Sequence, residues 1–261
     1  MRSLNIAATG MLAQQLNVEV ISNNIANMNT TGFKRQRAEF QDLLYQTVQR
    51  VGAQTSAADT RNASGIQIGV GVRAGGVYRI TEQGNMTQTY NDYDMAIDGR
   101  GYFRIQLPTG EDAYARAGSF QLSDNGELVT PEGYRIQPGV TVPADAVDVS
   151  ISENGIVQVK IDGQVDYQTV GQIELATFPN EAGLESIGNN LLIESPSSGA
   201  PTVGLPGDAG FGKLRQGFLE TSNVNPVSEI TALITAQRAY EMNSKVIQTA
   251  DEMMNATTQI R

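Results

Sequence analysis

Acidic side chains are the most abundant ionisable groups in this chain, since its 261 residues include 28 Asp and Glu but no His and no Cys. Without His and Cys, a Ser-His-Asp triad, a cysteine nucleophile and a Cys/His zinc site are excluded. A pair of carboxylates could still hydrolyse a glycosidic bond, but no spacing among the acidic residues selects a pair. We therefore predict no catalytic residue, no cofactor and no metal site.

Three short motifs resemble ligand-binding loops but lack a residue that the ligand needs. Gly207–Lys213 has the G-x-x-x-x-G-K spacing of a phosphate loop, but Leu214 stands where Ser or Thr would bind Mg²⁺. Gly69–Ala74 resembles a dinucleotide fingerprint, yet residues typical of a strand follow it instead of a helix. A calcium-loop pattern that begins at Asp92 has Phe103 where a Glu is required. We interpret all three as glycine-rich or solvated turns.

Glycine content and charge divide the chain into two ends that are compatible with helices and a centre that is rich in turns. Residues 1–50 hold two Gly, residues 51–220 hold 25 and residues 221–261 hold none, and the net charges of these segments are +2, −11 and −1. We predict an α+β fold in which N- and C-terminal coiled-coil-forming helices flank a mainly antiparallel β middle domain. The expected boundaries are an N-terminal helix in 1–44, an extended connector in 45–73, a β-rich outer domain in 74–220 and a C-terminal helix in 221–261, the two helices sharing one helical core domain.

The N-terminal segment has the spacing of a helix that packs lengthwise on another helix. Apolar residues recur at alternating intervals of three and four from residue 4 to residue 28, with Gln14 as the one polar member. Ser3 is the expected N-cap and Gly32 the residue that stops the helix, which should span about residues 3–30. The predicted assembly contacts on this helix are Leu4, Ala7, Met11, Val18, Ile21 and Ile25.

The C-terminal segment has the same spacing. Asn225 and Pro226 predict an N-cap followed by proline at the first helical position, and the helix should run over about Pro226–Thr257. Apolar residues recur at intervals of three and four from residue 233 to residue 254, interrupted by Asn243. The predicted assembly contacts on this helix are Leu233, Ala236, Tyr240, Ile247, Ala250 and Met254.

The middle of the chain is typical of antiparallel β structure. Ile156–Ile161 alternates apolar and polar residues, and Asn125-Gly126, Asn154-Gly155 and Asp162-Gly163 are pairs that favour hairpin turns. The stretch Val51–Ser64 is low in hydrophobicity and without a period, which indicates an extended or mobile connector. Further strands are expected at 74–80, 95–107, 114–122, 171–178 and 213–219.

Charge and hydropathy narrow the choice of partners. The net charge of −10 argues against a nucleic acid. No apolar run approaches the about 20 residues of a membrane span, so direct membrane insertion is not expected, and the N-terminal residues lack the pattern of a cleaved signal peptide.

Asparagine is unusually frequent near the end of the N-terminal helix. Asn is a mediocre helix former, so these residues either line a polar helix face with a frayed end or form a hydrogen-bonding face against other helices. The five residues are Asn17, Asn23, Asn24, Asn27 and Asn29.

Four stretches together resemble the flagellar rod, hook and hook-associated axial protein family. Residues 22–34 match its N-terminal signature at every fixed position, residues 222–247 resemble its C-terminal end, and residues 96–103 and 114–120 resemble two conserved β motifs, with departures at Tyr102 and Ala115. The signature residues carried over are Ser22, Asn23, Asn24, Ala26, Asn27, Gly32, Phe33, Lys34, Asn225 and Pro226.

The resemblance, which is strongest to the distal-rod member, implies a structural subunit and no enzyme. Such a subunit would polymerise with itself into a tubular helical drive shaft that transmits torque from motor to hook. The implied partners are proximal-rod subunits, hook subunits, the ring (bushing) proteins and the flagellar type III export apparatus, and the implied location is the periplasmic rod of the basal body. A proximal-rod or hook subunit, and a carboxylate-based periplasmic hydrolase, remain as alternatives.

Overall fold

A computed structural model describes residues 2–49, 64–164 and 166–259. The chain divides into two compact units: the first contains residues 1–25, 36–78 and 225–261, and the second contains residues 26–35 and 79–224. The chain therefore passes from one unit to the other four times. Each unit is described by itself below.

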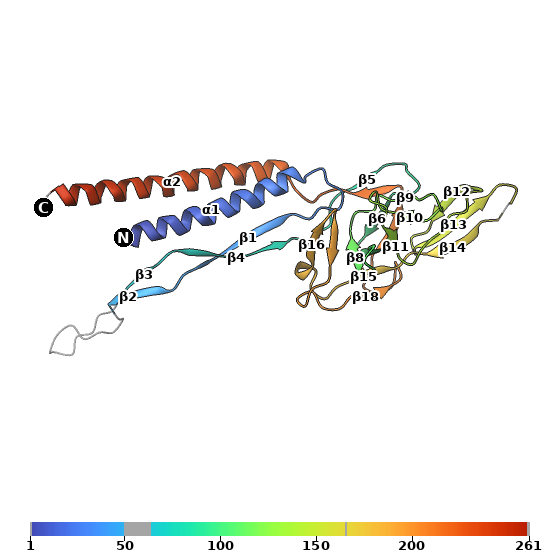
Figure 1. Ribbon diagram of the computed structural model, residues 1–261, viewed down its shortest axis with the longest axis horizontal. Coiled ribbons are helices and arrows are strands. Elements are labelled where there is room, and N and C mark those ends of the chain that lie inside the picture. The colour runs from blue at the N-terminus through green and yellow to red at the C-terminus, as the bar shows by residue number, and fades with distance from the viewer. Residues whose placement is uncertain (1, 50–63, 165, 260–261) are drawn as a thin grey trace. The chain divides into compact units, whose positions relative to one another are not determined.

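Two long helices and a series of short strands make up the fold (Figure 1). The helices are α1 (Arg2–Ala26) and α2 (Pro226–Gln259), with one 3₁₀ turn, η1 (Glu181–Gly183). The strands are β1 (Gln36–Asp42), β2 (Tyr45–Gln49), β3 (Ile66–Gly69), β4 (Val72–Arg79), β5 (Met86–Gln88), β6 (Met95–Asp98), β7 (Tyr102–Gln106), β8 (Asp112–Ala115), β9 (Gln121–Leu122), β10 (Leu128–Val129), β11 (Arg135–Ile136), β12 (Ala146–Ile151), β13 (Ile156–Ile161), β14 (Gln168–Gln172), β15 (Leu175–Thr177), β16 (Glu185–Gly188), β17 (Leu191–Ile193), β18 (Thr202–Gly204), β19 (Lys213–Gln216) and β20 (Phe218–Glu220).

The first unit combines α1 and α2 with two strand pairs, β1–β4 and β2–β3. The N-cap predicted for α2 is confirmed, because the side-chain oxygen of Asn225 accepts hydrogen bonds from the N–H groups of Val227 (3.1 Å) and Ser228 (3.3 Å). The N-cap predicted at Ser3 is wrong, because α1 already includes Arg2. α1 also ends at Ala26, earlier than expected, because a turn follows it in which the N–H of Thr30 bonds the carbonyl of Asn27 at 3.2 Å.

The second unit is built from antiparallel strands. Its largest sheet has nine strands in the order β16-β17-β8-β7-β11-β10-β9, with β15 pairing β7 and β18. The second unit also contains a three-stranded sheet, β12-β13-β14, and two strand pairs, β6–β19 and β5–β20. The strand predicted at Ile156–Ile161 is β13, and Gly126, Gly155 and Gly163 occupy the left-handed conformation expected of their turns.

Some expected strands are interrupted where glycine bends the chain. The run expected at 95–107 is split into β6 and β7, because Gly99 and Gly101 between them have φ values of +113° and +138°. The run expected at 213–219 is likewise split by Gly217, at +72°. Periodicity alone did not reveal these bends.

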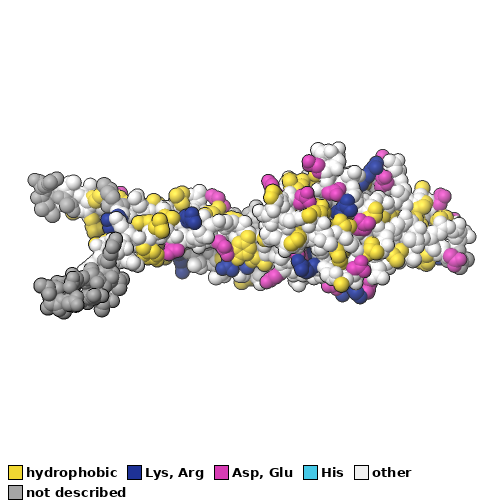
Figure 2. All heavy atoms as spheres, turned by 90° about the horizontal axis from the view of Figure 1, so that it is seen from below, with side chains coloured by type: hydrophobic (Ala, Val, Ile, Leu, Met, Phe, Trp, Pro, Cys, Tyr) yellow, Lys and Arg dark blue, Asp and Glu magenta, His cyan; other side chains and the backbone are white. Residues whose placement is uncertain are grey.

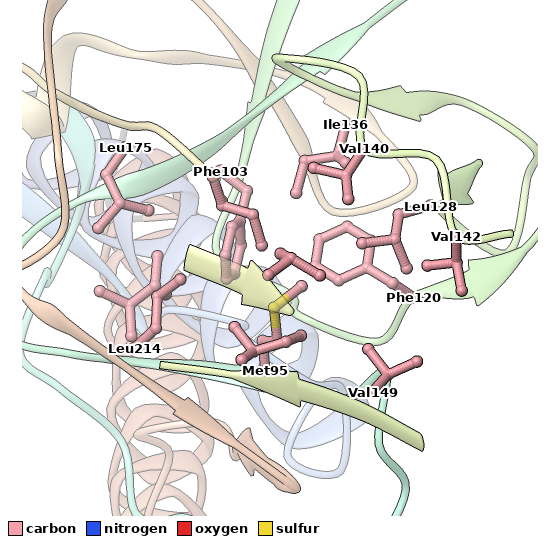
Figure 3. Packing of buried hydrophobic residues seen from close by; sticks show 14 of the residues in the cluster. Met95, Phe103, Phe120, Leu128, Ile136, Val140, Val142, Val149, Leu175 and Leu214 are labelled. Carbon is pink, nitrogen blue, oxygen red and sulfur yellow. The ribbon is translucent and has the colours of Figure 1, made fainter. Parts of the chain in front are cut away.

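A hydrophobic core fills the second unit. Phe103 and Phe120 meet edge to face with ring centroids 5.1 Å apart, and Met95, Leu128 and Leu214 surround them (Figure 3). Two smaller clusters lie around Phe178 and Ile105. The predicted arrangement of an N-terminal helix, a C-terminal helix and a mainly antiparallel β middle is thus confirmed, whereas the predicted domain boundaries remain a prediction. Apart from Ser64, the connector stretch Val51–Ser64 lies outside the described residues.

Candidate functional site: the terminal helices and the signature segment

The two terminal helices face each other along a line of small and polar residues in the first unit. Asn24 of α1 donates a hydrogen bond to the carboxylate of Glu229 on α2 (3.1 Å), and a Cβ added to Gly10 would lie 3.0 Å from the side chain of Asn243. Gly10 and Asn24 are 14 residues apart on α1, and their partners Asn243 and Glu229 are 14 residues apart on α2 in the opposite order. The two contacts therefore belong to the same antiparallel packing of the two helices. On α2 the contact line continues at seven-residue intervals through Ala236 and Ala250, both buried. We call the α2 residues Glu229, Ala236, Asn243 and Ala250 the inner line.

α1 also contacts the β strands of the first unit. The N–H of Val72 points at the hydroxyl of Thr9 at 3.4 Å, and a Cβ added to Gly71 would lie 2.3 Å from that hydroxyl. Gly71, with φ +125°, is therefore required both by its conformation and by the close approach of α1. α1 lies between α2 and the strand pairs (Figure 1).

The helix pair leaves open grooves on its flanks. One, of about 720 Å³, is lined by Gln14 and Asn17 of α1 and by small residues of α2 such as Thr231 and Ala236. A second, of about 350 Å³, lies between Val18 and Tyr240. A single chain therefore does not fill the space around its own helices, in contrast to the close packing usual for protein interiors.

The predicted assembly contacts are only partly covered within one chain. Ala7, Ile21, Ala236 and Ala250 are buried. Tyr240 is 44 % exposed, and the remaining predicted contacts are half-buried: Leu4, Met11, Val18, Ile25, Leu233, Ile247 and Met254. Whether other copies of the chain cover these side chains remains a prediction.

Asn24 is the signature residue that organises the first unit. Its side-chain nitrogen donates to the carbonyl of Gln36 (2.8 Å), and its side-chain oxygen accepts from the N–H of Gln36 (2.9 Å), so its amide pairs with the first residue of β1 as a backbone partner would. The same nitrogen also reaches Glu229, and Asn24 is 1 % exposed. One amide thus fixes the end of α1 against the starts of β1 and α2. These bonds all lie within one chain, so the hydrogen-bonding face against other helices of an assembly remains a prediction. Ser22, Asn23 and Ala26 are exposed.

Lys34, the last residue of the N-terminal signature, belongs to a buried ionic cluster in the second unit. Glu220, 2 % exposed, accepts from the ammonium of Lys34 and from Nε of Arg116, each at 2.5 Å, and from the N–H of Gly84 at 2.9 Å. Arg116 also donates to the carbonyls of Ile97, Gly99 and Gly101. We call Lys34, Arg116 and Glu220 the ionic cluster.

Glu220 has more charged and hydrogen-bonding partners in the ionic cluster than Lys34 has. Burial alone would raise the pKa of Glu220, but Arg116 and Lys34 outweigh it and hold the pKa below its usual value. Burial lowers the pKa of Lys34, because its ammonium faces a single carboxylate and the carbonyl of Glu82. Glu220 is therefore firmly ionised, and it fixes both cations in place.

Two further signature features hold residues 26–35 in the second unit. The N–H of Gly32 bonds the carbonyl of Glu220 (2.9 Å), and a Cβ on Gly32, whose φ is +67°, would lie 2.6 Å from the backbone nitrogen of Ala117. Asn223 accepts from the N–H of Arg35 (2.7 Å) and donates to the carbonyls of Ile80 and Glu82. Polar contacts therefore occur close in sequence to all four crossings between the units.

The phosphate-loop-like motif Gly207–Lys213 leads into a strand. Lys213 begins β19, not a helix, and its ammonium pairs with Glu153 at 2.8 Å. The described residues contain no group of three or more metal-binding side chains and no helix long and apolar enough to cross a membrane.

Three protein-family models match the chain. The first, described as "Flagella basal body rod protein", matches residues 4–34; "Flagellar hook protein FlgE/F/G D1 domain" matches residues 96–159; and "Flagellar basal body rod FlgEFG protein C-terminal" matches residues 215–260. The flagellar basal-body rod protein FlgG of Caulobacter vibrioides is 63 % identical over 100 % of both chains. The chain belongs to the flagellar basal-body rod protein family.

Other relatives place it within that family. The FlgG protein of Agrobacterium fabrum is 52 % identical over 97 % of both chains, whereas the rod protein FlgF of Caulobacter vibrioides is only 32 % identical over 98 % of this chain and 96 % of its own. A solved structure, the hook protein FlgE2 of Helicobacter pylori, has 18 % identity and a TM-score of 0.26 over 72 % of this chain and 43 % of its own. The chain is a structural subunit of the flagellar distal rod, and its family implies self-assembly within the basal body.

Sequence reasoning did not find the ionic cluster. Lys34 and Glu220 are 186 residues apart, and Arg116 lies 104 residues from Glu220, so no local spacing connects them. Two indications were available, since Lys34 belongs to the N-terminal signature and Arg116 to the motif at residues 114–120.

Proposed function

We propose that the chain polymerises through its first unit into a tubular helical shaft that carries torque from the motor to the hook. The supporting observation is the state of the terminal helices, whose predicted contacts stay half-buried in a single chain and whose flanks are open grooves. Lengthwise packing of helices from several copies would cover both. Contacts that repeat without closing into a ring give a filament.

The second unit would form the outer part of the shaft. It carries the whole net charge, with ten basic and twenty acidic residues, whereas the first unit has eight of each. An acidic outer surface would discourage adhesion to the surrounding ring proteins, which suits a shaft that turns inside them. The ionic cluster would stabilise the second unit, and the bonds of Asn24 would stabilise the first, each against local unfolding under load.

The remaining assignments follow from this role. The subunit would act without catalysis, leave the cytoplasm through the flagellar type III export apparatus without a cleaved signal peptide, and reside in the periplasmic part of the basal body. Its partners would be copies of itself, proximal-rod subunits, hook subunits and ring proteins.

A charge placed on the helix contacts tests the proposal. Ile247→Asp or Met11→Asp should abolish polymers in electron micrographs of concentrated protein, and should abolish motility when it replaces the native gene, because a buried unpaired charge costs several kcal/mol at every repeat. Val147→Asp, at a 70 % exposed position of the second unit, is the matched control. Normal polymers from Ile247→Asp protein, or globular particles from the native chain, would contradict the proposal.

A further inference from the structure

Methionine is the most readily oxidised residue type in this chain. The sequence has eight Met but no Cys, no Trp and no His, so no thiol, indole or imidazole competes for an oxidant. Of the methionines in the described part of the chain, Met242 and Met253 are the most exposed, at 61 % and 63 %, whereas Met95 is fully buried in the core of the second unit. The most accessible thioethers therefore lie on α2.

Met242 and Met253 lie on one face of α2. They are eleven residues apart, which is three turns of helix, so they differ by about 20° in direction and by about 16 Å along the axis. Residues at intervals of three and four continue this face, and all of them are uncharged: Thr235, Ala239, Met242, Val246, Thr249 and Met253. We call these six residues the methionine face. It lies to one side of the inner line, since Met242 precedes Asn243 by one position and Met253 follows Ala250 by three.

The methionine face presents mainly apolar groups. The hydroxyls of Thr235 and Thr249 donate to carbonyls one turn earlier in α2, at 2.9 Å and 2.5 Å, so neither hydroxyl needs a partner from another molecule. Thr235 and Ala239 also line the open groove of about 720 Å³ beside α1. Seen from below, hydrophobic side chains gather on the first unit among scattered charged ones (Figure 2). The methionine face is therefore suited to packing against another apolar surface.

We propose that Met242 and Met253 are oxidation sites of the unassembled subunit, and that their conversion to methionine sulfoxide by a hydroperoxide prevents polymerisation. The inference rests on the proposed function, because it takes a second copy of the chain to cover the methionine face. A thioether is apolar and adaptable, whereas a sulfoxide is polar and accepts hydrogen bonds. Assembly would bury two sulfoxide oxygens on a face that offers no free donor, and burial of a polar group without a hydrogen bond is costly.

The oxidation is a balanced two-electron step. The lone pair of the methionine Sδ forms a bond with one oxygen of hydrogen peroxide as the O–O bond breaks. The departing hydroxide takes the proton of the transferred hydroxyl, so the products are the sulfoxide and water. Sulfur loses two electrons and the peroxide gains them, and a sulfoxide reductase can reverse the change. The same subunit is therefore sensitive before assembly and protected after it.

Oxidation kinetics of the native chain test the two sites. Monomer and polymer are treated with dilute hydrogen peroxide, quenched and digested, and mass spectrometry quantifies the sulfoxide at each methionine. In the monomer, Met242 and Met253 should react at least about tenfold faster than Met95, and in the polymer at least about tenfold more slowly than in the monomer. Equal rates in monomer and polymer would show that the methionine face stays open after assembly, and would overturn the inference. Equal rates at Met95 and Met242 in the monomer would overturn it too.

The concentration needed for polymerisation measures the consequence. The reference chain carries Met11→Leu and Met254→Leu, so that the half-buried methionines of the first unit do not contribute, and each protein is compared with itself before and after oxidation. Oxidation should raise this concentration about tenfold or more in the reference chain, and less than about twofold once Met242→Leu and Met253→Leu are added. Adding Met28→Leu instead removes a 37 % exposed methionine of the second unit, and should leave the sensitivity unchanged. Sulfoxide reductases for both epimers should restore polymerisation of the oxidised reference chain.

Each contrary result identifies what is wrong. A chain with leucine at both sites that is as sensitive to oxidation as the reference chain would overturn the inference, and so would a loss that the reductases do not reverse. Normal polymers from protein with verified sulfoxide at Met242 and Met253 would refute the inference and leave the proposed function intact. The kinetic test needs no variant, so it decides even where a substituted chain does not assemble. Failure of the unoxidised native chain to polymerise would overturn the proposed function itself.

Discussion

The second unit encloses a core of phenylalanine, leucine and valine, whereas the first has hardly any core of its own. Of the 34 buried apolar residues in the described part of the chain, 28 belong to the second unit and six to the first, four of those six being alanine. Of the 23 exposed large hydrophobic residues described, 15 belong to the first unit, although it is the smaller. We therefore expect the second unit to fold by itself and the first to depend on burial that other copies supply.

Charge follows the same division. The first unit is neutral and the second carries −10. Low net charge with exposed apolar surface favours association, and a large net charge opposes it. The first unit thus has the surface expected of a part that assembles, and the second has the net charge expected of a part that does not adhere. This contrast leads to four predictions.

The largest expected effect is the loss of both terminal helices to proteolysis in the free monomer. Long helices with little buried surface open at low cost in free energy. Brief protease treatment of verified monomer should remove α1 and α2, and mass spectrometry should find the β-rich part intact, with residues 26–35 still held in the second unit. The polymer should resist the same treatment. Equal protection of both termini in the monomer would show that the helix pair is stable within one chain.

The fold was predicted from the sequence where local chemistry decides it. Asn225 and Pro226 mark the start of α2, and alternation between an Asn-Gly pair and an Asp-Gly pair marks β13. Periodicity identified apolar faces on both helices, but not which neighbour each would meet. On α1 the contacts with α2 fall on Gly10 and Asn24, beside the predicted contacts, because these small and polar residues allow close approach and hydrogen bonding that no hydropathy pattern encodes.

Within the second unit, Glu220→Gln should have the largest effect. It leaves Lys34 and Arg116 buried without their common carboxylate, which should lower the free energy of unfolding by about 3–5 kcal/mol. Denaturant titration of the full chain, followed by tyrosine fluorescence of the β-rich part, measures the change. Glu153→Gln, which removes the exposed partner of Lys213, is the control and should have little effect. Equal effects of the two variants would contradict a structural role for the ionic cluster.

A smaller effect should appear in the acid dependence of stability. The pKa of Glu220 in the folded chain lies below the usual value of 4.5, so its stabilising contribution is complete above that pH and is lost as the pH falls through the lower folded pKa. The difference in unfolding free energy between the native chain and Glu220→Gln should therefore shrink below about pH 4.5. A difference that stays constant down to pH 2 would show that the glutamine acts through packing instead of charge.

The smallest effect concerns the N-cap of α2. It distinguishes an α2 that is already stable in the free monomer from one that forms stably only in the polymer. Asn225→Ala removes the hydrogen bonds to Val227 and Ser228 and costs about 1 kcal/mol wherever α2 is formed. If α2 forms stably only on assembly, the monomer's unfolding curve should not change, while the concentration needed for polymerisation should rise about fivefold. Asn225→Asp, which keeps an accepting oxygen, should restore most of the loss. A loss of helicity in the Asn225→Ala monomer of the size expected for a capped helix would show that α2 is already stable in a single chain, and the contrast between the two units would then be one of packing alone.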